Sequence, residues 1–416
     1  SLHFTGSTSR ACVGQSHHLV FRSADRSPGD RPMVVSGARC AAVLLLAFAA
    51  ARAVPDVDGP LLNGNFEYQP NRSQMNGTRV TGAHAIPYWK ATGPVEYVES
   101  GTDRPGDGMV LVVPEGAHAV RLGSGASVRQ QLSLTRGACY SVTFSAARTC
   151  GQSERLRLSV VPVDAADAPG RELPIQTVYS ASGWDSYAWA FHAERGVVTL
   201  VIHHGDDGGA EDPACGPLVD AVAIKTLHPA AQAAGGNLLR NGGFEEGPYV
   251  VPGSTCGVLV PPMDEDAVSP LPGWMVMSYS KAAKYVDAAR HAVPGGSRAV
   301  ELVAGVEAAL VQEVDTVPGS ACRMEFSVGD AGDGCVACGP ELQPMRVVAA
   351  ATGAQGTATV EYHSRGTGGH ARGELAFTAE GSRTRVVLYS SGYHTMSDGS
   401  GSLCGPVVDD VSLVCA

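Results

Sequence analysis

The chain has 416 residues, of which 44% are hydrophobic and 17% are charged, and this length suffices for two domains of ordinary size, so disorder over most of the chain is excluded. The 51 Gly and 26 Pro residues favour short strands joined by turns over long helices. The formal net charge is −11 and no block of five or more Lys or Arg residues occurs, which argues against nucleic-acid binding.

The first 53 residues are interpreted as processing segments. A basic stretch begins at Met33, an apolar run covers residues 40–51, and small residues flank a cleavage position at Ala53. This pattern predicts a secretory signal peptide over residues 33–53. A membrane-spanning helix is excluded, because the apolar run is too short to cross a bilayer. Residues 1–32 are interpreted as a gene-model extension or as disordered. Removal of the six Arg and two Asp in this region leaves 24 basic and 39 acidic residues, a net charge of −15.

The rest of the chain contains one internal repeat. The motif Asn-Gly-x-Phe-Glu at residues 63–67 returns at residues 241–245, and short β-branched stretches bounded by Gly, Asp and Ser lie between matched blocks. We predict an all-β chain of two tandem jelly-roll β-sandwich domains. The first domain is expected at 57–227 and the second at 237–416, with an Ala- and Gly-rich linker at 228–236.

Several longer sequence segments resemble those of a known family. SPLPGWMVMS at residues 269–278, AVELV at 299–303 and LCGPVVDDV at 403–411 are similar to the plant cell-wall family called domain of unknown function 642. The resemblance covers both repeats. It implies galactose-binding-like domains, secretion to the cell wall, binding of wall polysaccharides, and association with pectin methylesterase.

Aromatic residues are candidates for sugar binding, because pyranose rings stack their apolar faces on aromatic rings. Trp184, Tyr187 and Trp189 fall near one strand, whose alternation puts Tyr187 and Trp189 on one face. The second copy is read as offering Glu374 and Ala376 there, so a ligand-facing role is favoured more for this pair than for Trp89, with core packing as the alternative.

Two loop residues, Tyr393 and His394, are further candidates for a glycan site, with a solvated loop as the alternative. For Trp89 and Trp274, which recur in the two copies, core packing is the favoured interpretation.

Recurring carboxylates carry a metal hypothesis. Glu67 with Asp220, and Glu245 with Asp409, open and close the two repeats, and calcium prefers oxygen ligands. A structural calcium in each domain is therefore possible, although no cofactor is required. Acceptance of backbone hydrogen bonds at strand ends is the favoured alternative.

No catalytic signature points to an enzyme, since neither Gly-x-Ser-x-Gly nor His-Glu-x-x-His occurs. The acidic runs at 206–207 and 264–266 lie in polar, Gly- or Pro-rich surroundings typical of solvated loops. We expect a non-enzymatic wall protein, with a glycan-active enzyme and a pure protein-interaction regulator as alternatives. The charge of −15 opposes binding to polyanionic pectate and favours a basic enzyme partner.

Nine of the eleven cysteines follow the leader, and disulfides are the default in an oxidising compartment. The lone Cys-x-x-Cys motif at residues 335–338 has no second pair of cysteines at zinc-site spacing, which argues against a zinc site. Asn71 and Asn76 begin N-glycosylation sequons and predict an exposed loop. The pairings expected are Cys150–Cys215, Cys335–Cys404, Cys322–Cys415 and Cys256–Cys338, with Cys139 left as a buried free thiol.

Overall fold

The computed structural model describes residues 59–101, 112–150, 154–163, 170–175, 178–179, 182–205, 215–229, 235–249, 257–259, 268–278, 281–335 and 344–416. The regular elements of these residues are strands, apart from two 3-10 helices, η1 (Arg72–Gln74) and η2 (Gly305–Glu307). The predicted all-β class is confirmed. The expected signal peptide and upstream extension lie outside the described residues.

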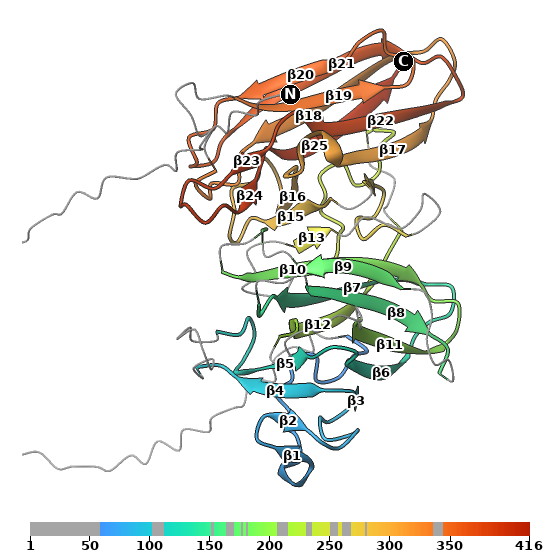
Figure 1. Cartoon of the computed structure of the whole chain (residues 1–416). Helices are drawn as coiled ribbons and strands as arrows, with labels where there is room; N and C mark the ends of the chain where they lie inside the picture. The colour runs from blue at the N-terminus through green and yellow to red at the C-terminus, as the bar shows by residue number, and fades with distance from the viewer. Residues whose placement is uncertain are drawn as a thin grey trace, which may run out of the picture. The chain divides into compact units, whose positions relative to one another are not determined.

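The strands fall into two sets that follow the sequence repeat (Figure 1). The first set is β1 (Met75–Asn76), β2 (Arg79–Val80), β3 (Lys90–Thr92), β4 (Val95–Glu99), β5 (His118–Leu122), β6 (Ser127–Ser133), β7 (Cys139–Ala147), β8 (Glu154–Val161), β9 (Arg171–Ile175), β10 (Trp184–His192), β11 (Val197–His204) and β12 (Leu218–Leu227). The second set is β13 (Gly257–Leu259), β14 (Met275–Met277), β15 (Ala283–Asp287), β16 (Arg298–Glu301), β17 (Ala309–Asp315), β18 (Ala321–Gly329), β19 (Met345–Ala351), β20 (Ala358–Tyr362), β21 (His370–Thr378), β22 (Arg383–Ser390), β23 (His394–Thr395), β24 (Leu403–Cys404) and β25 (Val407–Cys415).

Each domain is a sandwich of two sheets, and the order of the strands is the same in the two domains. In the first domain the five-stranded sheet runs β3-β6-β11-β8-β9, opposite strands ordered β4-β5-β12-β7-β10. In the second domain the orders are β14-β17-β22-β19-β20 and β15-β16-β25-β18-β21. The two orders match strand for strand, so the sequence repeat is a repeat of architecture, and the tandem β-sandwich prediction is confirmed.

Successive side chains point to opposite faces of each strand, and the apolar side chains that point inward fill the two cores. Trp89 and Trp274 are each 1% exposed, and each ring lies 5.5 Å from a phenylalanine ring, Phe66 and Phe244 respectively. Core packing of the two tryptophans is therefore what the structure shows. Each indole N–H also donates to the backbone carbonyl of a loop asparagine, Asn63 or Asn241, which satisfies the polar atom of a buried ring.

The short strand β13 connects the larger sheets of the two sandwiches. It pairs in parallel with β10 and antiparallel with β15, which makes one sheet of thirteen strands. Residues 57–416 form one compact unit. The expected linker at 228–236 lies in part outside the described residues.

Candidate functional site

The aromatic residues of β10 lie against the first core. Tyr187 is 3% exposed and stacks on Phe144, with ring centroids 5.3 Å apart. Trp189 is half-buried, packs on the same core and stacks on Phe191. The two residues share a face, as alternation predicts, but this face looks inward. The ligand-facing role expected for Tyr187 is therefore wrong.

Strand register explains the error. Tyr187 lies opposite Phe144, and in the second copy the residue opposite Phe326 is Gly373. By the same register Trp189 corresponds to Leu375, a core residue, so the counterparts are one position away from those read off the sequence. A Cβ on Gly373 would lie 2.7 Å from the Phe326 ring. The smaller residue is thus packed over by its neighbours, and the position belongs to the core in both copies.

The other expected sugar-site residues are not brought together with β10. The half-buried Trp184 donates its indole N–H to the Val112 carbonyl, 2.8 Å away. Tyr393 is exposed, and its hydroxyl donates to the Glu307 carboxylate. His394 follows on β23, where burial lowers the pKa of its imidazole. Sugar binding by these three residues stays a prediction.

A pair of exposed tyrosines, which the sequence analysis missed, lies in the first domain, in the segments that precede η1 and β3. Tyr68 and Tyr88 are 61% and 59% exposed, and their ring centroids are 6.0 Å apart with an interplanar angle of 63°. Two large aromatic faces at a steep angle form an open corner. We call Tyr68 and Tyr88 the tyrosine pair.

The tyrosine pair is held by one buried side chain. Asn63, 3% exposed, accepts a hydrogen bond from the Tyr68 backbone N–H at 2.9 Å and donates to the Pro87 carbonyl at 3.1 Å. It also donates to the Tyr68 carbonyl at 3.4 Å. The segments carrying the two rings are therefore fixed relative to each other by the buried amide of Asn63.

Tyr88 has a strained backbone. It occupies the third position of a turn closed by the Trp89 N–H on the Ile86 carbonyl, with Pro87 before it and φ of 70°. Turns with proline second and a positive φ third usually have glycine or asparagine there, and a tyrosine costs about 1–3 kcal/mol. The second copy has Gly273 at this position, with φ of 84°.

Tyr88 is an exception among the strained residues. Seven non-glycine residues of the described chain have positive φ, and six form three pairs related by the repeat. The seventh is Tyr88. The pairs are Asn63 with Asn241, Phe66 with Phe244, and Ala221 with Asp410. The positive φ itself recurs at Gly273, so the fold requires this turn conformation but not a tyrosine in it, which indicates a function for the Tyr88 side chain.

The second domain has the same scaffold without the rings. The Asn241 amide bonds the Glu246 backbone and the Pro272 carbonyl, as Asn63 bonds Tyr68 and Pro87. Glu246 and Gly273 therefore stand where the first domain has Tyr68 and Tyr88. Comparison of Pro87-Tyr88-Trp89 with Pro272-Gly273-Trp274 was the sequence signal that could have revealed the pair.

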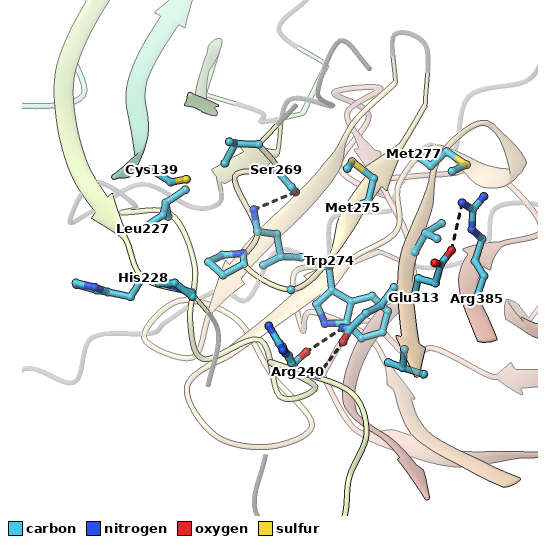
Figure 2. A pocket seen from close by; sticks show the side chains of 18 of the residues that line it. Cys139, Leu227, His228, Arg240, Ser269, Trp274, Met275, Met277, Glu313 and Arg385 are labelled. Carbon is cyan, nitrogen blue, oxygen red and sulfur yellow. Dashed lines mark hydrogen bonds and ion pairs between the residues drawn. The ribbon is translucent and has the colours of Figure 1, made fainter. Parts of the chain in front are cut away.

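A hollow of about 1180 Å³ lies beside Gly273 (Figure 2). Arg385 lies against Glu313 at one end, with nitrogen and oxygen 3.6 Å apart, and Met275 and Met277 line it nearby. The opposite end is lined by residues that include Cys139. Thioethers offer apolar contact and guanidinium groups donate hydrogen bonds, so this hollow can accommodate a polar ligand with apolar patches.

The recurring carboxylates hold loops. Glu67 accepts from the backbone N–H groups of Ala117 and His118, at 2.6 and 2.8 Å, and Asp220 accepts from the Glu115 N–H at 3.1 Å. Each pair predicted from the repeat therefore lies close together. In the second copy Glu245 accepts from Ser297 N–H and Asp409 from Gly295 N–H.

Burial raises the pKa of these aspartates. The Asp220 carboxyl has its pKa well above the ordinary value because it is buried, although two backbone N–H groups oppose the shift. Burial raises the pKa of Asp409 to about 7 against the same opposition. Among the described residues, no group of three or more His, Cys, Asp and Glu side chains is arranged for a metal ion. Calcium binding stays a prediction.

Three disulfides occur among the described residues: Cys150–Cys215, Cys322–Cys415 and Cys335–Cys404. They are three of the four pairings expected from the sequence, and Cys256 and Cys338 lie outside the described residues. Cys139 has a free thiol, as expected, but it is only half-buried, because it lines the hollow of Figure 2.

Asn71 and Asn76 are exposed, as their sequons predict. The Asn71 side chain caps η1 and accepts from the Ser73 backbone N–H at 3.1 Å. No membrane-crossing helix occurs in the described part of the chain.

Comparison with known proteins gives one family. The family described as Protein of unknown function (DUF642) matches residues 59–225 and 237–414. Protein DUF642 L-GALACTONO-1,4-LACTONE-RESPONSIVE GENE 2 of Arabidopsis thaliana is 52% identical, over 88% of this chain and 94% of its own length. A second Arabidopsis relative, the corresponding GENE 1 protein, is 50% identical over 90% of this chain and 95% of its own.

Among solved structures, the N-terminal CBM22-1–CBM22-2 tandem domain of Paenibacillus barcinonensis Xyn10C is 13% identical, with a TM-score of 0.25, over 79% of this chain and 93% of that chain. The two matched segments of the family coincide with the two sandwiches that carry the Asn63 and Asn241 scaffolds. The chain is thus a plant DUF642 family member.

Proposed function

We propose that this protein is a secreted, non-enzymatic cell-wall protein that binds polysaccharide through the tyrosine pair of its first domain. The observation that carries the proposal is the strained, exposed Tyr88 beside Tyr68. An aromatic face stacks on the apolar face of a pyranose ring, and the steep angle between the rings lets one stack while the other contacts the edge of the sugar. The fixed backbone reduces the ordering cost of binding.

The test replaces the tyrosine pair with the residues of the second copy. Tyr68→Glu with Tyr88→Gly should weaken glycan affinity by roughly 1–3 kcal/mol per lost stacking contact, by analogy with base stacking on aromatic rings. The melting temperature should stay equal or rise, because glycine relieves the positive φ of Tyr88. A glycan array followed by calorimetry on the best ligand measures both effects.

The variant Asn71→Gln, which removes an N-glycosylation sequon, provides a control. Asn71 lies three residues after Tyr68, so a glycan attached there could cover the tyrosine pair, and affinities are compared with and without Asn71→Gln. If Tyr68→Glu with Tyr88→Gly leaves the glycan affinity unchanged, both with and without Asn71→Gln, the sugar-binding site lies elsewhere.

Association with pectin methylesterase is the second part of the proposal, and it is supported by the acidic charge of the chain after the leader. A pure protein-interaction regulator would bind the enzyme and no glycan. Turnover of a glycan by the purified protein would instead reveal an enzyme. Structural calcium bound near the Glu67–Asp220 and Glu245–Asp409 pairs remains compatible with this function.

Secretion is supported by the three disulfides, which form and persist in oxidising compartments. N-terminal sequencing of protein recovered from the wall should start near Val54. Recovery of residues 1–32 in the mature protein would contradict the proposed leader.

A further inference from the structure

The connection between β16 and β17 is longer than its counterpart in the first sandwich. Leu302 and Leu122 correspond, because each donates its backbone N–H to the proline carbonyl of a Cys-Gly-Pro segment. Strand register likewise equates Ala309 with Ser127. Six residues, 303–308, lie between the first and second of these positions in the second domain, against four, 123–126, in the first. The longer connection forms η2.

The connection that follows β22 is also longer in the second domain. Strand register equates Ser390 with His204, and the Cys-Gly-Pro segments equate Cys404 with Cys215. Thirteen residues, 391–403, lie between Ser390 and Cys404, whereas ten, 205–214, lie between the first-domain pair. The longer segment contains Tyr393, and residues 205–214 include no aromatic residue.

The two extended connections contact each other through Tyr393. Its hydroxyl donates a hydrogen bond to the Glu307 carboxylate of η2. Its ring lies against Gly305, where a Cβ atom would be 3.1 Å from two ring carbons and where φ is 54°. Tyr393 is nevertheless 47% exposed, so its ring is held in place and remains open to solvent.

We call Val306, Glu307 and Tyr393 the η2 patch. Val306 is 67% exposed, and neither Val306 nor Tyr393 belongs to either of the two large hydrophobic cores. The second sandwich therefore fills its core without the η2 patch. Exposed residues that two extended loops hold together are typical of binding sites on a rigid scaffold.

The η2 patch has the groups that recognise a pyranose ring. The aromatic ring and the valine offer apolar surface to the C–H face of a sugar. An ionised carboxylate has two oxygens with about four lone-pair sites, so the single bond from Tyr393 leaves Glu307 free to accept from sugar hydroxyls. Hydrogen bonds to a charged acceptor are stronger than those to a neutral one.

We propose that the η2 patch is a second glycan site, which binds an uncharged pyranose oligomer independently of the tyrosine pair. The inference rests on the proposed function for the class of ligand and adds a site on the other domain. The charge of Glu307 disfavours a uronate at this site, because like charges repel. Two sites on one chain let the protein hold two segments of a polysaccharide, and the second contact then forms at a high effective concentration.

The experiment counts binding events on the full-length protein. Calorimetry uses four neutral β-1,4-linked tetrasaccharides, of glucose, xylose, mannose and galactose, with tetragalacturonate as the charged comparison. At least one neutral tetrasaccharide should bind at two sites per chain. Tyr68→Glu with Tyr88→Gly should remove one binding event, and Tyr393→Ser should weaken the other about tenfold, a typical loss for one aromatic stacking contact.

A matched pair of valine variants separates the η2 patch from general loss of exposed apolar surface. Val306 and Val317 flank the two ends of β17 and are 67% and 70% exposed. Val306→Ser should weaken the second binding event about twofold to threefold, whereas Val317→Ser should leave both events unchanged. If Tyr393→Ser lowers the melting temperature, the valine pair carries the test, because both valines are exposed.

A single binding event, or two events that neither Tyr393→Ser nor Val306→Ser weakens, would overturn the second site and leave the tyrosine pair in place. Loss of an event in Tyr393→Ser but not in the tyrosine exchange would instead support the η2 patch and overturn the tyrosine pair. Tighter binding of tetragalacturonate at the η2 patch would overturn the uncharged class of ligand. Absence of binding to all four neutral tetrasaccharides would overturn the second site, and absence of binding to every glycan would overturn the proposed function as well.

Discussion

Trp189 packs its half-buried ring on the first core and on Phe191, 5.6 Å between centroids. Trp189→Ala should therefore lower the free energy of unfolding by about 2–3 kcal/mol, somewhat less than the loss at a fully buried aromatic residue. Glycan affinity per folded molecule should not change. Thermal melting and calorimetry on the same preparation check both, and a loss of affinity at constant melting temperature would restore the ligand-facing interpretation.

Asp409 makes stability depend on pH. Its pKa is raised to about 7, chiefly by burial, whereas an unfolded aspartate titrates near about 3.9. The folded state therefore holds a proton that the unfolded state releases between these values. The contribution to stability is complete below about pH 4 and is lost as the pH rises through about 7.

The test is the slope of stability against pH between 4 and 7. Asp409→Asn, which does not ionise, should flatten the decline seen in urea unfolding of the natural chain, although loss of one accepted hydrogen bond lowers stability at every pH. Asp315→Asn, at a side chain 97% exposed, should keep the slope. A variant at 409 with an unaltered slope would refute the assignment.

At the scale of elements, the strands are the constant part of the repeat and the turns carry the differences. β7 and β18 occupy the same place in their sheets, and the Cys-Gly-Pro segments precede β12 and β25 in the same way. The residues that differ in kind, Tyr88 and Gly273, lie in matching turns. A turn tolerates such exchange because its side chain points to solvent, whereas a core position is filled on all sides.

The buried disulfide Cys335–Cys404 should contribute strongly to the second domain. It closes a segment of 69 residues, so its loss through Cys335→Ser with Cys404→Ser should lower the free energy of unfolding by about 4 kcal/mol in the chain-entropy account. Urea unfolding under non-reducing conditions measures the change. Cys139→Ser, at the free thiol, should alter stability by about 0.5 kcal/mol or less. Equal effects of the two changes would contradict the assignment.

At the scale of the whole molecule, the acidic net charge favours a neutral glycan and a basic protein partner over a polyanionic glycan. Charges on the protein act on a ligand within about a Debye length, ~8 Å at physiological salt.

A complex with a basic pectin methylesterase should weaken as salt rises beyond about 0.15 M, because exposed charges are then screened within ~8 Å. Affinity measured across a salt series, with an acidic isoform of the enzyme as control, checks this. Binding that is independent of salt would point to an apolar interface instead.

The sequence by itself determined the all-β class, the two-domain repeat, the core roles of Trp89 and Trp274, and the family. These follow from local composition, from alternation and from phrases that recur in order, which need no coordinates. The disulfide partners were also within reach, because the Cys-Gly-Pro motif recurs beside a second cysteine in each copy.

Only the tertiary structure decided which face of β10 looks inward, because alternation assigns two residues to one face without saying what covers that face. Pairing register also corrected the counterparts of Tyr187 and Trp189 to Gly373 and Leu375, each one residue before the position expected from the sequence. The tyrosine pair joins residues from two separate turns. Such sites depend on backbone angles and on strand neighbours, which arise only when the two sheets pack together.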